Sequence, residues 1–431
     1  GGLFLMSARE PLPGLRTEDH GLLRFLTCGS VDDGKSTLIG RLLYDSKSIL
    51  ADALATIERT SRKRGLEAVD LSLLTDGLQA EREQGITIDV AYRYFSTGAR
   101  KYIIADAPGH EQYTRNMVTA ASTADLAIIL VDARKGVQTQ TRRHSCIAHL
   151  VGIPHLVVAV NKMDLVDYSQ EFFDRIRQDY LRFAATLGIR DVRFIPISAL
   201  EGDMVVERGN RLPWYKGPAL MELLETSPPA HHEAPEQLRF PVQYVCRPRT
   251  AEHRDYRGYM GRIESGEVAI GDEVQVLPSG RRTRIDDLCL LDRPLPQAGS
   301  GRSVTLLLED EVGISRGDMI VSPSRAPSVT KRIEAMVCWL AEAPLEPGRK
   351  YVVRHTTRET KALVAAIEFR QDINELKRVA GGRLEMNDIG SVTFKLAQPL
   401  FVDPYRENRA TGAFILIDEA TNNTVGSGMI F

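Results

Sequence analysis

Short, nearly continuous apolar runs recur through the first half of the chain, and longer polar stretches separate them. Runs of strand length cover residues 22–28, 101–105, 126–131, 155–160 and 192–197. An apolar run of this length is typical of a strand that is buried on both faces of a parallel sheet. The intervening stretch 171–187 is of helical length. From about residue 22 to 224 the pattern therefore predicts an α/β domain, a parallel sheet with helices on both faces.

After residue 238 the pattern changes to short strands separated by glycine-rich turns. Strands are predicted at 240–246, 258–263, 273–277, 364–369, 391–396 and 413–417. This spacing leaves no room for crossover helices, so we expect two small all-β barrels. Proline-bearing joints at 227–235 and 322–328 separate the parts. The predicted domains are residues 1–226, 238–325 and 328–431.

The segment from Gly29 to Thr37 has the spacing of a phosphate-binding loop, Gly-x4-Gly-Lys-Ser. It follows the predicted strand 22–28 and opens a predicted helix, whose N-terminus favours an anion. Glycines let the backbone wrap around phosphate oxygens, Lys35 reaches the β and γ phosphates, and the hydroxyl of Ser36 is placed to ligate Mg²⁺. Every position of the loop is a candidate nucleotide contact: Gly29, Ser30, Val31, Asp32, Asp33, Gly34, Lys35, Ser36 and Thr37.

Two further segments concern the metal and the γ-phosphate. Asp106 follows the predicted strand 101–105, where its carboxylate can hold Mg²⁺ through water and the amide of Gly109 can face the γ-phosphate. Thr87 lies in a polar stretch that is suited to closing over Mg²⁺ and the γ-phosphate as a switch. His110 is either an ordinary surface histidine or the side chain that orients the attacking water. Its place beside Gly109 favours the second role.

The last two segments of the site specify the base, and they follow the predicted strands 155–160 and 192–197. A carboxylate at Asp164 can accept two hydrogen bonds from the N1 and N2 edge of guanine, a donor pair that adenine lacks. A backbone amide of the second segment can reach the guanine oxygen. The candidate contacts with the base are Asn161, Lys162, Asp164, Ser198, Ala199 and Leu200. Together, in this order and beside predicted strands, the five segments predict a site for GTP and GDP.

Charge and cysteine content narrow the class of protein. The chain has 431 residues with 55 basic and 57 acidic side chains, a net charge of −2, so no global excess of positive charge indicates a nucleic-acid partner. The apolar runs fall short of a membrane helix. The five cysteines are odd in number, widely spaced and without a Cys-x-x-Cys pair, which favours reduced thiols over disulfides or a zinc site. We therefore expect a cytoplasmic protein.

An Asp-x-Pro-Gly-His segment at 106–110, in a GTPase domain followed by two barrels, resembles the translation elongation factor family along essentially the whole chain. The phosphate loop departs from that family, because translation factors normally carry histidines where this chain has Ser30 and Asp33. Several strings more closely resemble the GTPase subunits of bacterial sulfate adenylyltransferase. These strings are residues 29–45, 110–117, 132–144 and 411–430.

This resemblance implies a heterodimer in which a smaller partner binds ATP and sulfate and forms adenosine 5′-phosphosulfate and pyrophosphate, while this chain hydrolyses GTP. It implies that Lys35 stabilises the β/γ charge and that Ser36 and Thr87 ligate Mg²⁺. Asp106 would hold the ion through water, and His110 would orient the attacking water. Asp32 is a candidate ligand for a monovalent cation. The alternatives are a translation factor that delivers aminoacyl-tRNA, which Ser30 and Asp33 disfavour, and a non-hydrolysing GTP sensor, which His110 disfavours.

Overall fold

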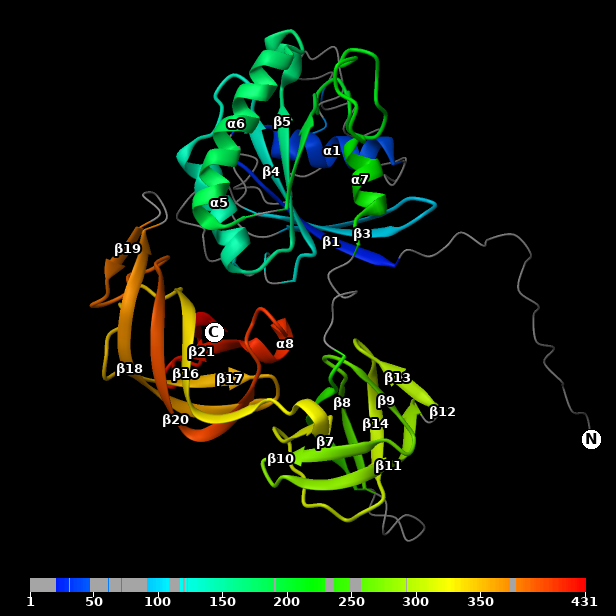
Figure 1. Cartoon of the computed structure of the whole chain (residues 1–431), viewed down its shortest axis with the longest axis vertical. Coiled ribbons are helices and arrows are strands. Elements are labelled where there is room, and N and C mark those ends of the chain that lie inside the picture. Colours follow the sequence, from blue (N-terminus) through cyan, green and yellow to red (C-terminus); the bar gives the residue numbers. More distant parts are fainter. Residues whose placement is uncertain are drawn as a thin grey trace, which may run out of the picture.

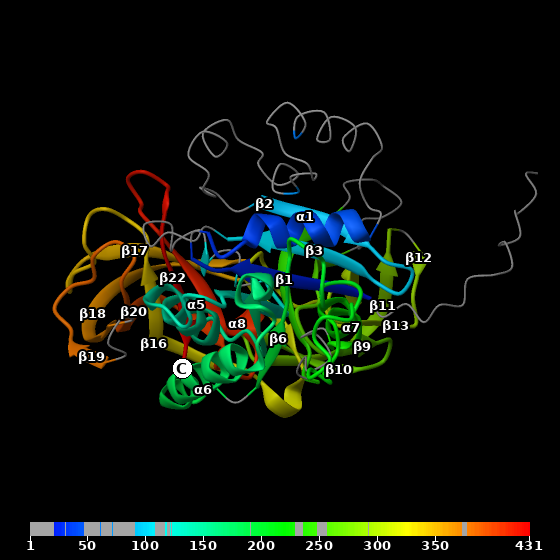
Figure 2. The same ribbon diagram turned by 90° about the horizontal axis from the view of Figure 1, so that it is seen from above.

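The structure is a computed structural model with three parts, an α/β part and two barrels (Figure 1). It describes residues 21–30, 32–46, 61, 71, 91–107, 117–118, 121, 123–189, 191–228, 236–247, 257–291, 293–372 and 377–431. In two perpendicular views the barrels lie next to each other on the same side of the α/β part (Figures 1 and 2).

The α/β part contains a six-stranded sheet with strand order β2-β3-β1-β4-β5-β6. Its strands are β1 (Leu22–Cys28), β2 (Ala91–Ser96), β3 (Lys101–Asp106), β4 (Leu126–Asp132), β5 (His155–Asn161) and β6 (Val192–Pro196). Five of them are parallel, as predicted, and β2 pairs antiparallel with β3 at one edge. Since only four residues join β2 to β3, they can form a hairpin but not a crossover.

Helices flank both faces of this sheet (Figure 1). They are α1 (Lys35–Asp45), α5 (Thr139–Leu150), α6 (Gln170–Leu187) and α7 (Leu220–Thr226), with the short 3-10 helix η3 (Met163–Val166) after β5. In α6 the residues Phe173, Ile176 and Tyr180 are buried at helical spacing, so one stripe of the helix packs on the core. The helix ends at Gly188, whose φ of 72° is favourable for glycine.

The first barrel is closed by a pairing between β10 and β11, which joins the two ends of the order β10-β15-β7-β8-β14-β11. The strands of this part are β7 (Arg239–Cys246), β8 (Gly258–Arg262), β9 (Glu267–Ala269), β10 (Glu273–Leu277), β11 (Arg281–Leu290), β12 (Arg293–Pro294), β13 (Gln297–Gly299), β14 (Ser303–Leu308) and β15 (Met319–Val321). Alternate residues such as Phe240 and Val242 fill its core, which is the period expected of barrel strands.

The second barrel closes in the same way, through β17 and β18 at the ends of the order β17-β21-β22-β16-β20-β18. Its strands are β16 (Ser328–Trp339), β17 (Lys350–His355), β18 (Arg358–Asp372), β19 (Lys377–Ala380), β20 (Ile389–Val402), β21 (Ala413–Ile417) and β22 (Thr424–Ile430). The short helix α8 (Arg409–Gly412) precedes β21, and η6 (Pro323–Arg325) lies between the barrels. The predicted fold class is confirmed, while the domain boundaries stay a prediction.

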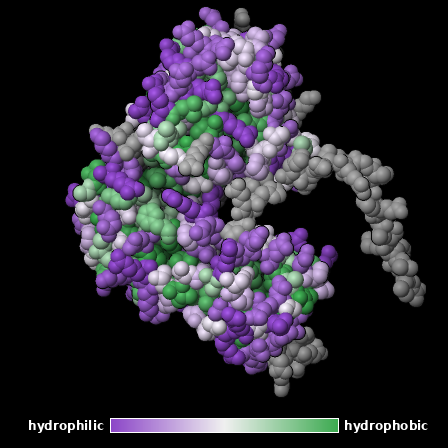
Figure 3. Space-filling view, viewed as in Figure 1, coloured by the Kyte–Doolittle hydropathy of each residue, from purple (hydrophilic) through white to green (hydrophobic). Residues whose placement is uncertain are grey.

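The α/β part packs on the second barrel through apolar side chains. Cys146 and Ile147 of α5 belong to one buried cluster with Met336 and Cys338 of β16. In the space-filling view, hydrophobic residues gather where the α/β part meets the second barrel (Figure 3). Beside the cluster, the Tyr405 hydroxyl donates to the Val151 carbonyl at 2.5 Å. This contact fixes the end of α5 against the barrel.

The two barrels are joined by an ion pair between buried Arg239 and partly buried Asp403. Nε of Arg239 lies 2.8 Å from Oδ2 of Asp403, and Nη2 of the same guanidinium donates to Oδ1 at 3.0 Å. Such a bidentate pair fixes orientation as well as distance. All five cysteines are free of disulfides. No helix of the described part of the chain is long and apolar enough to cross a membrane.

Candidate nucleotide-binding site

The predicted site residues collect at the edge of the sheet where the parallel strands end. Cys28, Asp106 and Asn161 are the last residues of β1, β3 and β5. The loop at 198–200 follows β6 in the same direction. This edge of an open parallel sheet is where ligands generally bind.

The phosphate loop is held in shape by its own contacts. The carboxylate of Asp33 accepts a hydrogen bond from the Ser30 amide at 2.8 Å, and the Asp33 amide donates to the Ser30 carbonyl at 3.2 Å. Gly34 has φ 90°, and a Cβ at this position would overlap Nδ2 of Asn161. Both observations require glycine. Lys35, Ser36 and Thr37 follow in the first turn of α1, with their backbone amides at the helix N-terminus. Val31 lies outside the described residues.

Lys35 and Asp106 form a nearly buried pair beside this loop. Nζ of Lys35 lies 3.1 Å from Oδ1 of Asp106 and donates to the carbonyl of Ala107. The pair therefore places an ammonium group and a carboxylate oxygen, a hard metal ligand, at the N-terminus of α1. The hydroxyl of Ser36 supplies a second hard donor, and Mg²⁺ prefers such oxygen ligands, so the residues present fit this ion.

No group of three or more His, Cys, Asp or Glu side chains suited to a metal occurs within the described ranges. A Mg²⁺ site of this kind does not require one, because nucleotide phosphates and water provide most ligands. Three predicted participants, Thr87, Gly109 and His110, lie outside the described residues.

A single buried amide joins the phosphate loop to the predicted guanine loops. Nδ2 of Asn161 donates to the Asp33 carbonyl at 2.8 Å, and Oδ1 accepts from the Ala199 amide at 2.9 Å. Asn161 is 2% exposed. The next residue, Lys162, donates through Nζ to the carbonyl of Asp32. The loops at 161–164 and 198–200 are thus fixed relative to the phosphate loop.

Asp164 lies in η3, and its carboxylate is oriented by Ser198. The Ser198 hydroxyl donates to Oδ1 of Asp164 at 2.7 Å. Asp164 is half-buried, so its carboxylate is in reach of a ligand. An oriented carboxylate at this edge can accept the paired N–H groups of a guanine. Leu200 is 59% exposed, so its contribution to this loop is its backbone and not a buried side chain.

Arg41 is a supporting residue that the motifs did not predict. From α1 its Nε donates to the Ala199 carbonyl at 3.0 Å, and its Nη2 donates to the Leu200 carbonyl. The guanidinium therefore fixes the 198–200 loop against α1. Arg41 and Ala199 are 158 positions apart in the sequence, so no local pattern could have identified this contact.

Burial changes the acid–base behaviour of the phosphate loop. It raises the pKa of Asp33 from 3.8 to about 6, although the Ser30 amide and the nearby Lys135 act in the opposite direction. Asp33 is 3% exposed. A carboxylate with this pKa is charged at neutral pH and becomes protonated in mild acid.

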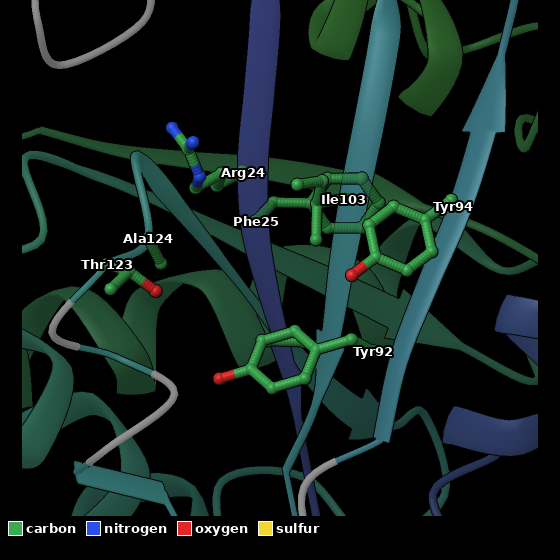
Figure 4. A pocket seen from close by; sticks show the side chains of 8 residues that line it. Arg24, Phe25, Tyr92, Tyr94, Ile103, Thr123 and Ala124 are labelled. Carbon is green, nitrogen blue, oxygen red and sulfur yellow. The ribbon is translucent and has the colours of Figure 1, made fainter. Parts of the chain in front are cut away.

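A separate hollow lies on the same sheet, away from this site. Tyr92 and Tyr94 of β2 project toward it, with Arg24 of β1 and Thr123 on the other side (Figure 4). None of the predicted nucleotide contacts lines it. The hollow is therefore not part of the candidate site.

Comparison with known proteins places the chain in a family. Residues 20–230 match the model of the elongation factor Tu GTP binding domain, and residues 332–431 match the GTP-eEF1A C-terminal domain-like model. Sulfate adenylyltransferase subunit 1 of Laribacter hongkongensis is 56% identical over 418 residues, which cover 96% of this chain and 86% of that protein. This chain belongs to the sulfate adenylyltransferase subunit 1 family.

Other relatives agree with this placement. The family member from Alteromonas mediterranea is 54% identical over 96% of this chain and 87% of its own length. The bifunctional enzyme CysN/CysC of Mycobacterium tuberculosis is 54% identical over 95% of this chain and 67% of its own length. The resemblance inferred from the sequence is thus confirmed. The name "subunit 1" implies that the related proteins work with another subunit.

Proposed function

We propose that this chain is the GTP-hydrolysing subunit of a sulfate adenylyltransferase. A partner subunit would bind ATP and sulfate and form adenosine 5′-phosphosulfate and pyrophosphate. The observation that carries the nucleotide assignment is the double contact of Asn161 with the phosphate loop and with the 198–200 loop. It supports the assignment of Lys35 and Asp164 to one site, with a phosphate end and a guanine end.

In this proposal each residue has a role in positioning or in charge stabilisation. Lys35 stabilises charge on the β and γ phosphates. Ser36, Thr87 and Asp106 would hold Mg²⁺, the last through water, and the ion would neutralise phosphate charge when bound. The Gly109 amide senses the γ-phosphate. Hydrolysis then needs no covalent intermediate, only an oriented water and a preorganised site.

His110 completes this set as the residue that orients the attacking water. Asp32 is proposed as a ligand for a monovalent cation beside the phosphates. It is exposed, its backbone is left-handed with φ 69°, and its carbonyl accepts a hydrogen bond from Lys162. Both assignments rest on the phosphate-loop sequence and on family membership.

The chemistry of sulfate activation explains why a GTPase would take part. A mixed anhydride of phosphate and sulfate is less stable than the phosphate anhydride that it replaces, so the reaction with ATP runs uphill. A second hydrolysis can drive it if the GTP and GDP forms of the subunit differ in their affinity for the partner's states. Each 1.4 kcal/mol of such coupling shifts an equilibrium about tenfold.

We further propose a cytoplasmic location, which the five free cysteines support. We also propose domain boundaries at 226, 238, 325 and 328. The second of these precedes β7 and the fourth begins β16. The remaining alternative, delivery of aminoacyl-tRNA, is an outcome of the experiment below.

Incorporation of radiolabelled sulfate tests the function. The chain is combined with the small subunit encoded in the same genome, and product is measured with GTP, with GDP and with a non-hydrolysable GTP analogue. Product formation should rise with GTP and should not be sustained by GDP or the analogue. Asp164→Asn, supplied with the same GTP, is the matched control and should lose the stimulation. The proposal would be refuted if product formation did not depend on guanine nucleotide and the chain bound aminoacyl-tRNA in a GTP-dependent way in a gel shift.

A further inference from the structure

We infer that Asp132 is a positioning residue of the nucleotide site, which acts by holding Lys162. This inference rests on the proposed guanine-nucleotide function. Asp132 ends β4 and is 1% exposed. It pairs in register with Asn161 of β5, and the amide of Ala133 donates to the Asn161 carbonyl at 2.9 Å. The carboxylate therefore lies at the same sheet edge as the residue after Asn161.

Two cations converge on this carboxylate. Arg134 donates to it from its backbone amide at 2.9 Å and from Nε and Nη2 at 3.1 and 2.8 Å. Nζ of Lys162 lies 3.2 Å from Oδ2. Burial raises the pKa of Asp132, but hydrogen bonds from Arg134 and Lys162 outweigh it and hold the pKa at about 2. The carboxylate is therefore charged at neutral pH.

Lys162 needs such an anchor because its backbone is in the left-handed region, with φ 62°. A non-glycine residue there costs free energy and persists only where the surroundings fix it. Its side chain is fixed at two points, the carboxylate of Asp132 and the carbonyl of Asp32 in the phosphate loop. The ammonium thus links the end of β4 to the phosphate loop and keeps Asp164, two residues later, at its place beside Ser198.

This arrangement predicts a specific kind of defect. Without the charge at Asp132 the ammonium of Lys162 loses its ion pair, so the loop from Asn161 to Asp164 is tied less tightly to the end of β4. Release of guanine nucleotide should become faster. Turnover of bound GTP should change little, because the phosphate end is built around Lys35 and Asp106. The defect should therefore raise KM for GTP more than it lowers kcat.

A double-mutant cycle on the full chain tests the inference. Dissociation of fluorescent GDP is measured for the wild type, Asp132→Asn, Lys162→Met and the double variant. Asp132→Asn should release GDP roughly five to thirty times faster, and Lys162→Met at least as fast. In the Lys162→Met background Asp132→Asn should have no further effect, since its anchor function is already lost.

Asp191→Asn is the matched control. Asp191 pairs with His155 at 2.6 Å at the opposite end of β5, so this variant should release GDP like the wild type. Should Asp132→Asn not fold, Asp132→Ser, which keeps an oxygen acceptor in a smaller side chain, takes its place in the cycle.

Two results would overturn the inference. One is unchanged GDP release in the folded Asp132 variant. The other is multiplication of the two single effects in the double variant, which would mean that Asp132 acts on the fold and not through Lys162. Failure of the guanine-nucleotide assignment on which the inference rests is distinguishable, because the wild type would then bind GDP and ADP alike.

Discussion

Replacing Asn161 with alanine removes the amide that joins the phosphate loop to the 198–200 loop. Two hydrogen bonds are lost, one to the Asp33 carbonyl and one from the Ala199 amide. Neither backbone group can move to a new partner without moving its loop. The variant should therefore bind guanine nucleotide weakly and should also be less stable.

The size of the effect follows from the number of groups left unpaired. A buried donor or acceptor without a partner costs about 1–3 kcal/mol. Water can enter a nucleotide site more readily than a closed core, so we take the lower half of that range for each group. The sum is about 2–4 kcal/mol, which corresponds to roughly a 30- to 1,000-fold loss of GDP affinity if the loops must be ordered to bind.

Calorimetric titration with GDP and thermal unfolding measure the two consequences. Asn408→Ala is the matched control, because Asn408 is also a buried asparagine, with Nδ2 2.9 Å from the Ser265 hydroxyl. This control should lose stability and keep wild-type affinity, since Asn408 lies between the barrels. If Asn161→Ala bound GDP like the wild type, or if the control lost as much affinity, the reasoning would be wrong.

Three further predictions concern individual side chains of the site. The wild type should prefer GDP to ADP, whereas Asp164→Asn should prefer XDP, and titration with fluorescent nucleotides measures both preferences. Equal GDP and ADP affinity in the wild type would contradict the assignment. His110→Ala should keep GTP affinity but lower turnover by roughly ten- to a thousandfold, whereas Lys35→Ala should lose binding; equal loss of binding in calorimetry would make His110 structural. Because burial raises the folded-state pKa of Asp33 to about 6, stability should fall as the pH rises from 3.8 to about 6. Asp33→Asn keeps an acceptor for Ser30 and should remove that slope, with a gain of up to about 3 kcal/mol at pH 7 in urea unfolding; a slope that survives the substitution would point to another group.

Features that depend on continuous stretches of sequence were predictable. The runs at β4 and β5 are buried on both faces, so their apolar residues are contiguous, and the polar residue that ends each strand stands out. The phosphate loop is likewise one segment, because its shape comes from contacts over three residues. Helix α1 begins at Lys35, inside the phosphate-loop motif, so the end of the motif also forms the first turn of the helix.

Features that depend on packing were not predictable. Strand β2 is half-exposed, and Tyr92 and Tyr94 leave no apolar run to mark it. The contact between Arg41 and Ala199 requires α1 to lie beneath a loop that follows a different strand. Asp132 had a signal, a charge at the end of a buried strand, but only the register with Asn161 shows what it holds.

The phosphate end and the guanine end of the site are therefore built differently, and this difference should separate the effects of substitutions. The guanine end is tied together over 38 and 128 residues by Asn161, and such contacts form only when the sheet is assembled. Asn161→Ala should lower the melting temperature without ligand and should also reduce the rise that GDP and Mg²⁺ produce. Ser36→Ala removes one half-buried hydroxyl from the first turn of α1, so it should leave the ligand-free melting temperature nearly unchanged while reducing the same rise, because ligand stabilisation depends on affinity. Equal loss of ligand-free stability in both variants, in one thermal-unfolding series, would show that the two ends are not distinct.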